Sequence, residues 1–198
     1  MKKIILSSVL FSTLAFAGPA PTAAPAKSAN TILFKAATGE TEFSAVGKPA
    51  MIKINGKGQG PEGVVTYAGD VISGTVKVDL NKLTTEIDLR DDHMKNKYLE
   101  VQKYPTADLT FKDFKISTAV DKLTDSEIEI PFTADFTMHG KTKPVSGMMK
   151  IKKAQKVITG EAEFSVKIME YLETLPSYAG IKIAEDVKLK IKLSGTIQ

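Results

Sequence analysis

The charged side chains best suited to chemistry gather in one stretch, Leu89–Phe111, of a chain that is otherwise patterned for strands. The stretch opens with Arg90, two aspartates and His93. Arginine presents a planar fork of donors that suits phosphate or carboxylate groups. Arg90 is therefore a candidate partner for an anionic head group, with a structural ion pair to Asp91 or Asp92 as the alternative. His93 is a second candidate, and local hydrogen bonding is its alternative role.

These residue types do not form a recognisable metal or catalytic site. The chain has two histidines and no cysteine, which removes thiolate ligands, cysteine nucleophiles and disulfides. A catalytic zinc takes about three protein ligands, and the adjacent residues Asp91, Asp92 and His93 cannot all converge on one ion without an unusual turn. The sequence has no nucleophile elbow, Walker loop or G-x-G-x-x-G fingerprint. We therefore predict no catalytic residues, no metal, no cofactor and no enzymatic activity.

A short helix is predicted to hold these charged groups between two strands. Asp91 or Asp92 can cap this helix, because a carboxylate accepts the free N–H groups of a first helical turn. Pro105 ends the helical segment and favours an extended backbone at Tyr104. A second insert, Met169–Ala184, is predicted to be non-strand and to contain one helical turn.

The rest of the chain alternates apolar and polar residues with a period of two, which is the signature of strands with one buried face. Such antiparallel strands need either two packed sheets or a closed barrel. The predicted strands are Thr41–Val46, Met51–Lys57, Val71–Leu80, Glu127–Met138, Pro144–Ile151, Val157–Ile168 and Asp186–Ile197, with a further strand that begins at Ala107.

We favour an all-β fold, an extended antiparallel eight-stranded barrel with one or two short helices, because the inward faces repeatedly carry small residues. An eight-stranded barrel is about wide enough to hold one small ligand, and small inward residues would leave room for it. The alternative is that some of the glycines mark bulges or bends. The small inward residues are Gly74, Ala134, Gly147, Gly160, Ala162 and Gly195.

The first thirty residues are predicted to be a targeting leader and a linker. Residues 1–17 resemble a cleavable signal peptide, with a basic start, an apolar run too short to span a membrane and a small-x-small cleavage site. Residues 18–30 are rich in proline and alanine, which predicts a flexible linker. The folded domain then covers residues 31–198. Such a leader predicts a periplasmic protein, with secretion as the alternative.

The charge of the chain does not indicate nucleic-acid binding. The formal net charge is +4, and the loss of Lys2 and Lys3 with a leader lowers it by two. Lys188, Lys190 and Lys192 alternate with apolar residues, which predicts a solvated strand face whose lysines discourage edge pairing. A stripe that binds phosphates or an anionic surface is the alternative.

Four motifs follow one another along the chain. They are Arg90-Asp91-x-His93 with Tyr98-Leu99, Tyr104-Pro105 with Leu109-x-Phe111, the run Ala134–Val145, and Pro176-Ser177 with Gly180-Ile181 and Val187-x-Leu189-x-Ile191. In this order they resemble the motifs of the YceI-like proteins, over about 31–198. Each motif alone is weakly specific, and their order carries the resemblance. The sequence departs from the family pattern at Met94, where leucine is usual, and at Ala134, where glycine is frequent.

The resemblance implies a lipocalin-like barrel whose apolar pocket holds a polyisoprenoid or a similar amphiphile. The chain is then expected to bind, transport or store a long-chain isoprenoid or similar amphiphilic lipid as its ligand. The polar end of the lipid would meet Arg90, His93 and Lys97 at the rim. The tail would thread between Val76, Phe111, Phe132, Phe136, Phe164, Val166, Leu189 and Leu193.

Two other functions stay open at the level of the sequence. A ligand-free structural or stress-response interaction module would have a dense core without a cavity. An enzyme acting on lipid-linked substrates would use His93 as an acid or base, although no paired carboxylate or nucleophile accompanies it. The expected partners are a lipid ligand, no nucleic acid and no stable membrane span, and the chain is expected to be a monomer or a homodimer.

Overall fold

The computed structural model describes residues 29–49 and 51–198. The predicted leader, residues 1–17, and nearly all of the predicted linker, residues 18–30, lie outside that part of the chain. Within it, the first strand begins at Asn30, next to the predicted start of the folded domain.

The described chain consists almost entirely of strands, as its period-two pattern predicts. One short α-helix, α1 (Asp88–Asp92), runs into a π-helical turn, η3 (His93–Tyr98). Single 3-10 turns are η1 (Ala36–Thr38), η2 (Leu80–Lys82), η4 (Val120–Lys122) and η5 (Ile168–Glu170). The strands are β1 (Asn30–Phe34), β2 (Glu40–Lys48), β3 (Ile52–Gln59), β4 (Glu62–Ala68), β5 (Val71–Asp79), β6 (Thr106–Lys115), β7 (Ile128–Met138), β8 (Lys141–Ala154), β9 (Val157–Lys167), β10 (Ser177–Tyr178), β11 (Ile181–Ile183) and β12 (Asp186–Ile197).

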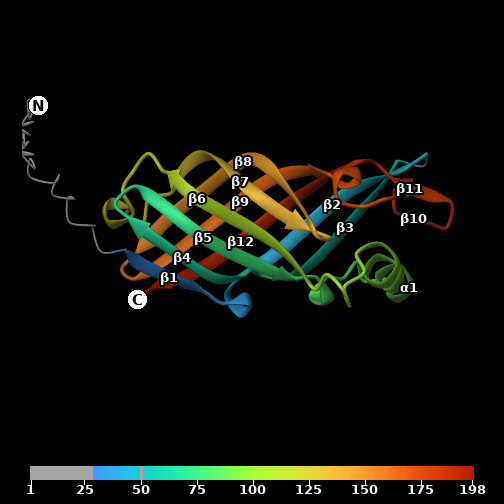
Figure 1. Ribbon diagram of the computed structural model, residues 1–198, viewed down its shortest axis with the longest axis horizontal. Coiled ribbons are helices and arrows are strands. Elements are labelled where there is room, and N and C mark those ends of the chain that lie inside the picture. Colours follow the sequence, from blue (N-terminus) through green and yellow to red (C-terminus); the bar gives the residue numbers. More distant parts are fainter. Residues whose placement is uncertain (1–28, 50) are drawn as a thin grey trace, which may run out of the picture.

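The predicted eight-stranded antiparallel barrel is confirmed. The ring runs in the order β1, β4, β5, β6, β7, β8, β9 and β12 (Figure 1). β1 completes it because it pairs with β4 on one edge and with β12 on the other. Closure leaves the ring with no long free edge, and alternate side chains of each strand face the interior.

β2 and β3 extend the barrel at one end. β2 pairs with β12 over 188–192, beside the part of β12 that pairs with β1, and β3 pairs with β2. On its other side β3 meets the segment between β5 and β6. The backbone N–H groups of Lys57 and Thr84 each donate to the carbonyl oxygen of the other, at 2.9 and 2.7 Å. β2 and β3 therefore complete the wall at the end that holds α1, β10 and β11 (Figure 1). We call this end the mouth end.

Side chains fill the opposite half of the barrel, the half near the two termini. Aromatic rings run through it toward the mouth end in a file, with neighbouring centroids 5.5 to 5.9 Å apart. Their tilted and edge-to-face contacts are the favoured arrangements for aromatic pairs. The file, in order, is Phe114, Phe111, Phe132, Phe164, Phe136 and Tyr171.

The small inward residues do not create a cavity, so that step of the sequence argument is wrong. A Cβ atom added to Gly195 would lie 2.6 Å from two ring atoms of Phe34, and one added to Gly147 would lie 2.9 Å from the ring of Phe132. These glycines make room for aromatic side chains instead of a ligand. Gly74 has a φ of 147° and lies at a register shift between β5 and β6, which confirms the alternative that a glycine marks a bulge.

Both predicted inserts differ in detail from the structure. Met169–Ala184 is not strand-free, because Ser177–Tyr178 and Ile181–Ile183 form the hairpin β10–β11, and β11 pairs with β2. The sequence predicts the helical turn of this insert at Tyr171–Leu175, and the 3-10 turn η5 (Ile168–Glu170) precedes that position. In the first insert neither aspartate caps α1. The residue before the helix is Ile87, and Asp91 lies within it.

The turn between β7 and β8 holds the first insert against the barrel. His139 and Gly140 both have positive φ, 52° and 72°, as a two-residue hairpin turn of this hand requires. His139 Nε2 lies 2.5 Å from Glu100 Oε2, and its ring stacks on Tyr104 at a centroid distance of 4.4 Å. The helical segment is therefore tied to the end of β7.

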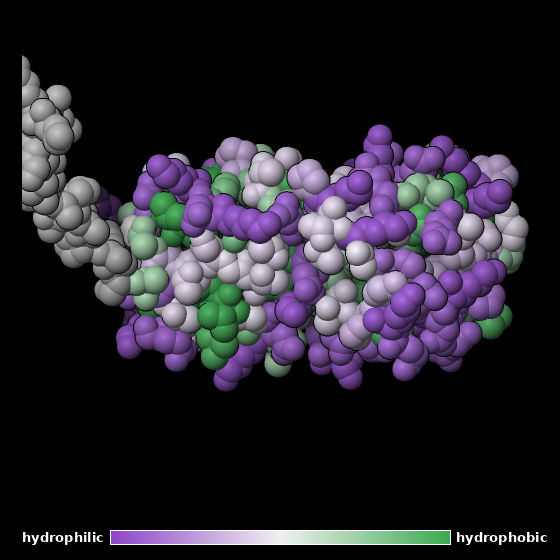
Figure 2. Space-filling model, viewed as in Figure 1, coloured by the Kyte–Doolittle hydropathy of each residue, from purple (hydrophilic) through white to green (hydrophobic). Residues whose placement is uncertain are grey.

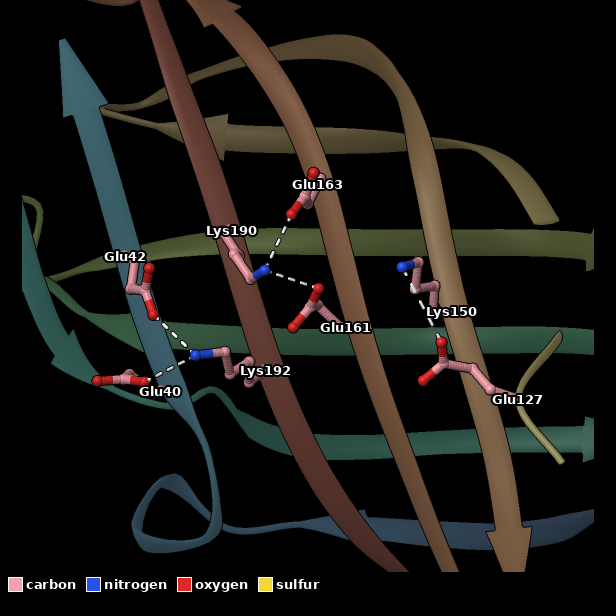
Figure 3. A network of polar contacts seen from close by, with 8 residues as sticks. All are labelled: Glu40, Glu42, Glu127, Lys150, Glu161, Glu163, Lys190 and Lys192. Atoms are coloured by element: carbon pink, nitrogen blue, oxygen red, sulfur yellow. Dashed lines mark hydrogen bonds and ion pairs between the residues drawn. The ribbon is translucent and has the colours of Figure 1, made fainter. Parts of the chain in front are cut away.

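The outer surface of the barrel is mostly hydrophilic, with apolar residues exposed in patches (Figure 2). On β12, Lys190 Nζ lies 2.8 and 3.0 Å from carboxylate oxygens of Glu161 and Glu163. Lys192 Nζ lies 3.2 and 2.8 Å from those of Glu40 and Glu42 (Figure 3). These hydrogen bonds raise the pKa of both lysines. Glutamates on both neighbouring strands thus pair with two of the three lysines of the stripe, Lys190 and Lys192.

The position of β12 in the sheet corrects the interpretation of the lysine stripe. The face is solvated, as predicted, but β12 is not an edge strand, because it lies between β9 on one side and β1 and β2 on the other. Its lysines therefore do not serve to discourage edge pairing. Exposed ion pairs of this kind contribute about 0–1 kcal/mol each, so the ion pairs of Lys190 and Lys192 matter for charge balance more than for stability.

Candidate functional site

A cavity of about 320 Å³ lies inside the mouth end of the barrel. This volume is at the lower end of the range for ligand pockets, roughly 300–1,000 Å³. Side chains of the strands and of both inserts line it. They are Thr41, Phe43, Ala45, Ile52, Ile54, Val78, Leu80, Leu83, Thr85, Arg90, His93, Met94, Tyr98, Leu99, Ala107, Phe136, Met138, Val166, Ile168, Leu172, Pro176, Ser177, Tyr178, Ala179, Ile181, Ile183, Val187, Leu189 and Ile191.

Two paired strands provide the longest wall of the cavity. Thr41, Phe43 and Ala45 are alternate residues of β2 and therefore share its inward face. β12 places Leu189 opposite Phe43 and Ile191 opposite Thr41, so the wall is built of cross-strand neighbours. This wall exists because β2 continues along β12 beyond the closed ring.

The aromatic file forms the floor of the cavity. Phe136 lines the cavity and packs edge-on against Phe164 and Tyr171, with centroids 5.5 Å away in each case. Phe164 in turn packs against Phe132. The space therefore ends at Phe136, and the barrel beyond it is occupied by side chains.

Thr41 adds a hydroxyl to this apolar space. Its side chain is buried, and Oγ1 has no hydrogen-bond partner within the described chain. A buried hydroxyl without a partner is costly. The inner wall therefore offers a polar contact to any ligand that reaches it.

Arg90 lies at the mouth and is held by a threonine, not by an aspartate. Its Nε donates to Thr85 Oγ1 and its Nη2 donates to the Thr85 carbonyl oxygen, both at 2.8 Å. Thr85 Oγ1 donates onward to Asp91. The guanidinium and the carboxylate are therefore connected through one hydroxyl. This geometry fixes the direction of the guanidinium and leaves its Nη1 donors outside these bonds.

Asp91 fastens the helix to the segment before it. Its carboxylate accepts hydrogen bonds from Thr84 Oγ1 at 2.5 Å and from the Thr85 backbone N–H at 2.7 Å, besides the Thr85 hydroxyl. Burial by itself raises the pKa of this carboxyl, but the hydrogen bonds outweigh burial and lower the pKa below its ordinary value. Asp91 is therefore ionised at neutral pH, and its charge supports the position of Arg90.

His93 and Met94 line the cavity from the first turn of η3. The His93 ring meets the edge of the Tyr178 ring from the β10–β11 hairpin, with centroids 5.9 Å apart. Helix and hairpin thus face each other across the mouth. Tyr98 joins them: its Oη donates to the Ser177 carbonyl oxygen at 3.1 Å and accepts from the Ser177 N–H at 3.0 Å.

The π-helical turn decides which side chains reach the cavity. The Leu99 N–H donates to the Met94 carbonyl oxygen at 2.9 Å, which is a five-residue step instead of the four-residue step of an α-helix. On an α-helix, Lys97 would share a face with Arg90 and His93. The wider turn brings Tyr98 to the cavity, whereas Lys97 is exposed with its Nζ 5.3 Å from the Tyr98 ring.

The structure brings together some of the residues predicted for lipid contact. Arg90 and His93 lie at the mouth, and Phe136, Val166 and Leu189 line the cavity. Lys97 does not line it, because the π turn directs Tyr98 there. Five of the predicted tail contacts do not line the cavity, because they belong to the filled half of the barrel or to the wall around the aromatic file. They are Val76, Phe111, Phe132, Phe164 and Leu193.

Sequence reasoning missed the residues that complete the mouth. Met94 was findable, because it is four residues after Arg90 on a helical segment. Tyr98 is in turn four residues after Met94, so the same spacing indicates it, although only the π turn places it at the cavity in preference to Lys97. Ser177 and Tyr178 belong to a hairpin too short to leave a period-two pattern. Thr85 precedes the helix and carries no motif.

Two further properties concern the described residues, 29–49 and 51–198. Among them, no three or more histidine, cysteine, aspartate or glutamate side chains are grouped so that they could hold a metal ion. None of their helices is both long and apolar enough to cross a membrane.

Comparison with known proteins identifies relatives of the domain. A family model described as "YceI-like domain" matches residues 28–195. A polyisoprenoid-binding domain structure from Saccharophagus degradans superposes with a TM-score of 0.68 at 17% identity and covers 84% of this chain and 98% of that one. BcnA of Burkholderia cenocepacia gives 0.60 at 16% identity, with 79% and 96% covered. The YceI protein of Campylobacter jejuni gives 0.57 at 17% identity, with 72% and 84% covered. No curated protein sequence matches the chain.

Proposed function

Because this chain belongs to the YceI-like domain family, we propose that it is a binding protein that holds the apolar part of an isoprenoid-type amphiphilic lipid inside its barrel. The observation that carries the proposal is the apolar cavity of about 320 Å³ with Arg90 at its mouth. The structural relative from Saccharophagus degradans is a polyisoprenoid-binding domain, which supports the same ligand class.

The cavity volume sets the length of chain that the barrel encloses. If one carbon of a packed chain takes about 30 Å³, as one water does in the liquid, 320 Å³ holds on the order of ten carbons. That is roughly two isoprene units. The Phe136 floor prevents a longer tail from threading the whole barrel unless the aromatic file moves. We therefore propose that a long lipid is held by one end segment near its head group.

Arg90 is proposed to recognise an anionic or strongly polar head group. An arginine has five N–H donors, and the two bonds to Thr85 leave the Nη1 donors for a ligand at the mouth. A phosphate or carboxylate suits this fork. His93 and Tyr178 provide aromatic surface beside it. The burial of each CH₂ contributes roughly 0.8 kcal/mol, so chain length should dominate affinity until the cavity is full.

The cavity also bears on the two alternative functions, the ligand-free interaction module and the enzyme. A ligand-free interaction module requires a dense core, and only the half of the barrel near the termini has one. The cavity at the mouth end favours a ligand. For an enzyme, His93 would need a partner that directs its proton, and its neighbour across the mouth is the Tyr178 ring.

We also propose that the chain works after export, as a periplasmic carrier or store. The support is the sequence of residues 1–17, which resembles a cleavable signal peptide. Cell fractionation and N-terminal sequencing of the native protein test this part separately. Recovery in the cytoplasm with an intact Met1 would refute it without affecting the binding proposal.

The binding proposal is tested by calorimetric titration with dimethylallyl, geranyl, farnesyl and geranylgeranyl phosphate, whose chains have five, ten, fifteen and twenty carbons. Affinity should rise about fourfold per added CH₂ until roughly ten carbons are enclosed, and then level off. Geraniol, which lacks the phosphate, measures the tail alone. Arg90→Gln should weaken geranyl phosphate by about tenfold or more while geraniol binding stays within about twofold. Equal loss for both compounds would refute the head-group role, and no binding of any of them would refute the proposed function.

A further inference from the structure

Two neighbouring segments beside the cavity mouth form a surface unlike the rest of the barrel. We call this surface the tip, and it consists of residues 46–49 and 51–54 at the β2–β3 turn and residues 174–184 at the β10–β11 hairpin. β11 pairs with β2, which joins the two segments into one extension beyond the ring (Figure 1). The extension stands next to the cavity, because eight of its residues line it: Ile52, Ile54, Pro176, Ser177, Tyr178, Ala179, Ile181 and Ile183.

The tip exposes large apolar side chains. Met51 is 68% exposed and Ile52 is 45% exposed, among the most exposed large apolar side chains of the described chain. They adjoin in sequence at the β2–β3 turn. On the other side of the mouth, Ile87 and Leu89 are also exposed at the start of α1. Apolar residues are visible among hydrophilic ones at this end of the molecule in Figure 2.

The tip is also basic, and its three lysines form no ion pair within the described chain, unlike six lysines elsewhere in it. The sequence of the tip contains Lys48, Lys53 and Lys182 and no aspartate or glutamate. The ion pairs found within residues 29–49 and 51–198 include none of the three. Lys190 and Lys192, by contrast, each have two glutamates (Figure 3).

Two of these lysines, Lys48 and Lys182, lie so close that a bound anion would stabilise the pair. Lys48 and Lys182 are direct cross-strand partners in the β2–β11 register. Like charges opposite each other in a sheet destabilise the pair. An anionic partner that contacts both would remove this repulsion. Exposed apolar side chains with neighbouring lysines are the composition of segments that enter the interface of an anionic bilayer.

We propose that the tip docks on the surface of a bilayer that contains anionic phospholipids, with Met51 inserted among the lipids and the three lysines at the phosphate level. Docking places the cavity mouth against the membrane, so that a lipid chain can pass between the two without crossing water. The helical side of the mouth does not share the anionic contact, because Asp88 lies between Ile87 and Leu89 there. The docking does not depend on which ligand the cavity holds.

Tryptophan fluorescence tests the insertion, because the chain has no tryptophan of its own. Met51→Trp places the only indole at the β2–β3 turn. Val157→Trp is the matched control, since Val157 is an exposed apolar residue on β9 at the opposite end of the barrel. With phosphatidylglycerol vesicles, emission of the Met51→Trp protein should shift to the blue and that of the control should not. An unchanged emission maximum for Met51→Trp would overturn the insertion.

Vesicle flotation tests the charge contact. The triple variant Lys48→Glu, Lys53→Glu and Lys182→Glu should bind phosphatidylglycerol vesicles at least about 100-fold more weakly, because each lost lysine contributes about fivefold near an anionic surface and each new carboxylate adds repulsion. Wild-type binding should weaken in high salt and on pure phosphatidylcholine. The matched control makes the same charge change at the far end of the barrel, at Lys122, Lys152 and Lys156. Equal binding by the two triple variants would overturn the proposal.

Geraniol titration separates this test from that of the proposed function. Geraniol is uncharged, so the tip lysines should not alter its affinity, and both triple variants should bind it as the wild type does. Vesicle binding that is lost while geraniol binding is kept supports the docking. If the tip variant also loses geraniol, Met51→Asp decides, since Met51 does not line the cavity. Undiminished flotation of Met51→Asp would then refute the docking.

Discussion

Ala45→Leu should raise stability and lower ligand affinity together, because the new side chain would fill the space that a ligand uses. Ala45 is 5% exposed, lies on β2 and faces the cavity. Leucine adds three carbons, which at about 30 Å³ each occupy roughly a quarter of the 320 Å³. No backbone movement is needed if these carbons enter existing space.

The sizes of the two effects follow from the same three carbons. Their burial stabilises the fold by at most about 2.4 kcal/mol, less 0.5–1 kcal/mol of side-chain entropy, so the gain is about 1.5 kcal/mol. For a domain of this size, that corresponds to a rise in Tm of roughly 3–6 °C. A ligand that can no longer bury three carbons loses about 2.4 kcal/mol, or roughly 60-fold in Kd.

Ala162→Leu is the matched control. Ala162 is 3% exposed on β9, also inside the barrel, but it does not line the cavity. The same three carbons are forced there into packed space, which should destabilise the protein by about 1–3 kcal/mol. Thermal unfolding and titration with geranyl phosphate measure both quantities. A loss of stability in Ala45→Leu similar to that of Ala162→Leu, or an affinity within threefold of wild type, would refute the cavity argument.

Two further predictions concern the hydrogen bonds that Asp91 and Tyr98 make at the mouth. The lowered pKa of Asp91 means that its contribution to stability is present above about pH 4 and is lost as the pH falls through the folded-state pKa. Asp91→Asn should therefore cost about 1–3 kcal/mol at pH 7, and its urea denaturation should depend less on pH between 6 and 3 than that of wild type; parallel pH profiles would contradict this role. Tyr98→Phe removes the hydroxyl that bonds to Ser177 and should speed dissociation of geranyl phosphate about tenfold in stopped-flow experiments. An unchanged dissociation rate would show that this hydrogen bond does not hold the mouth closed around the ligand.

The mouth was only partly predictable, and the reason is local. Arg90 and His93 stand out by residue type within a helical segment, and both reach the cavity. Lys97 follows the same face of an α-helix but is exposed, because one π turn shifts the register so that Tyr98 takes its place. Propensity does not distinguish a π turn from an α turn. The bond from Tyr98 to Ser177 joins residues 79 positions apart, which local sequence patterns do not reveal.

The sequence by itself predicted six of the eight ring strands, their inward faces and an antiparallel barrel, because side-chain alternation is a local property that burial imposes on a strand. It did not predict β1 and β4, which complete the ring, and the predicted strands Thr41–Val46 and Met51–Lys57 form β2 and β3 outside it. Only the tertiary structure decided where the barrel is hollow. Gly195 and Gly147 face inward as expected, yet aromatic rings from other strands cover them, whereas the cavity lies under Ala45 and Ala107 at the mouth end. Whether an inward position faces a ring or empty space depends on side chains that reach it from across the barrel. Those contacts join distant parts of the chain, and alternation along a single strand does not encode them.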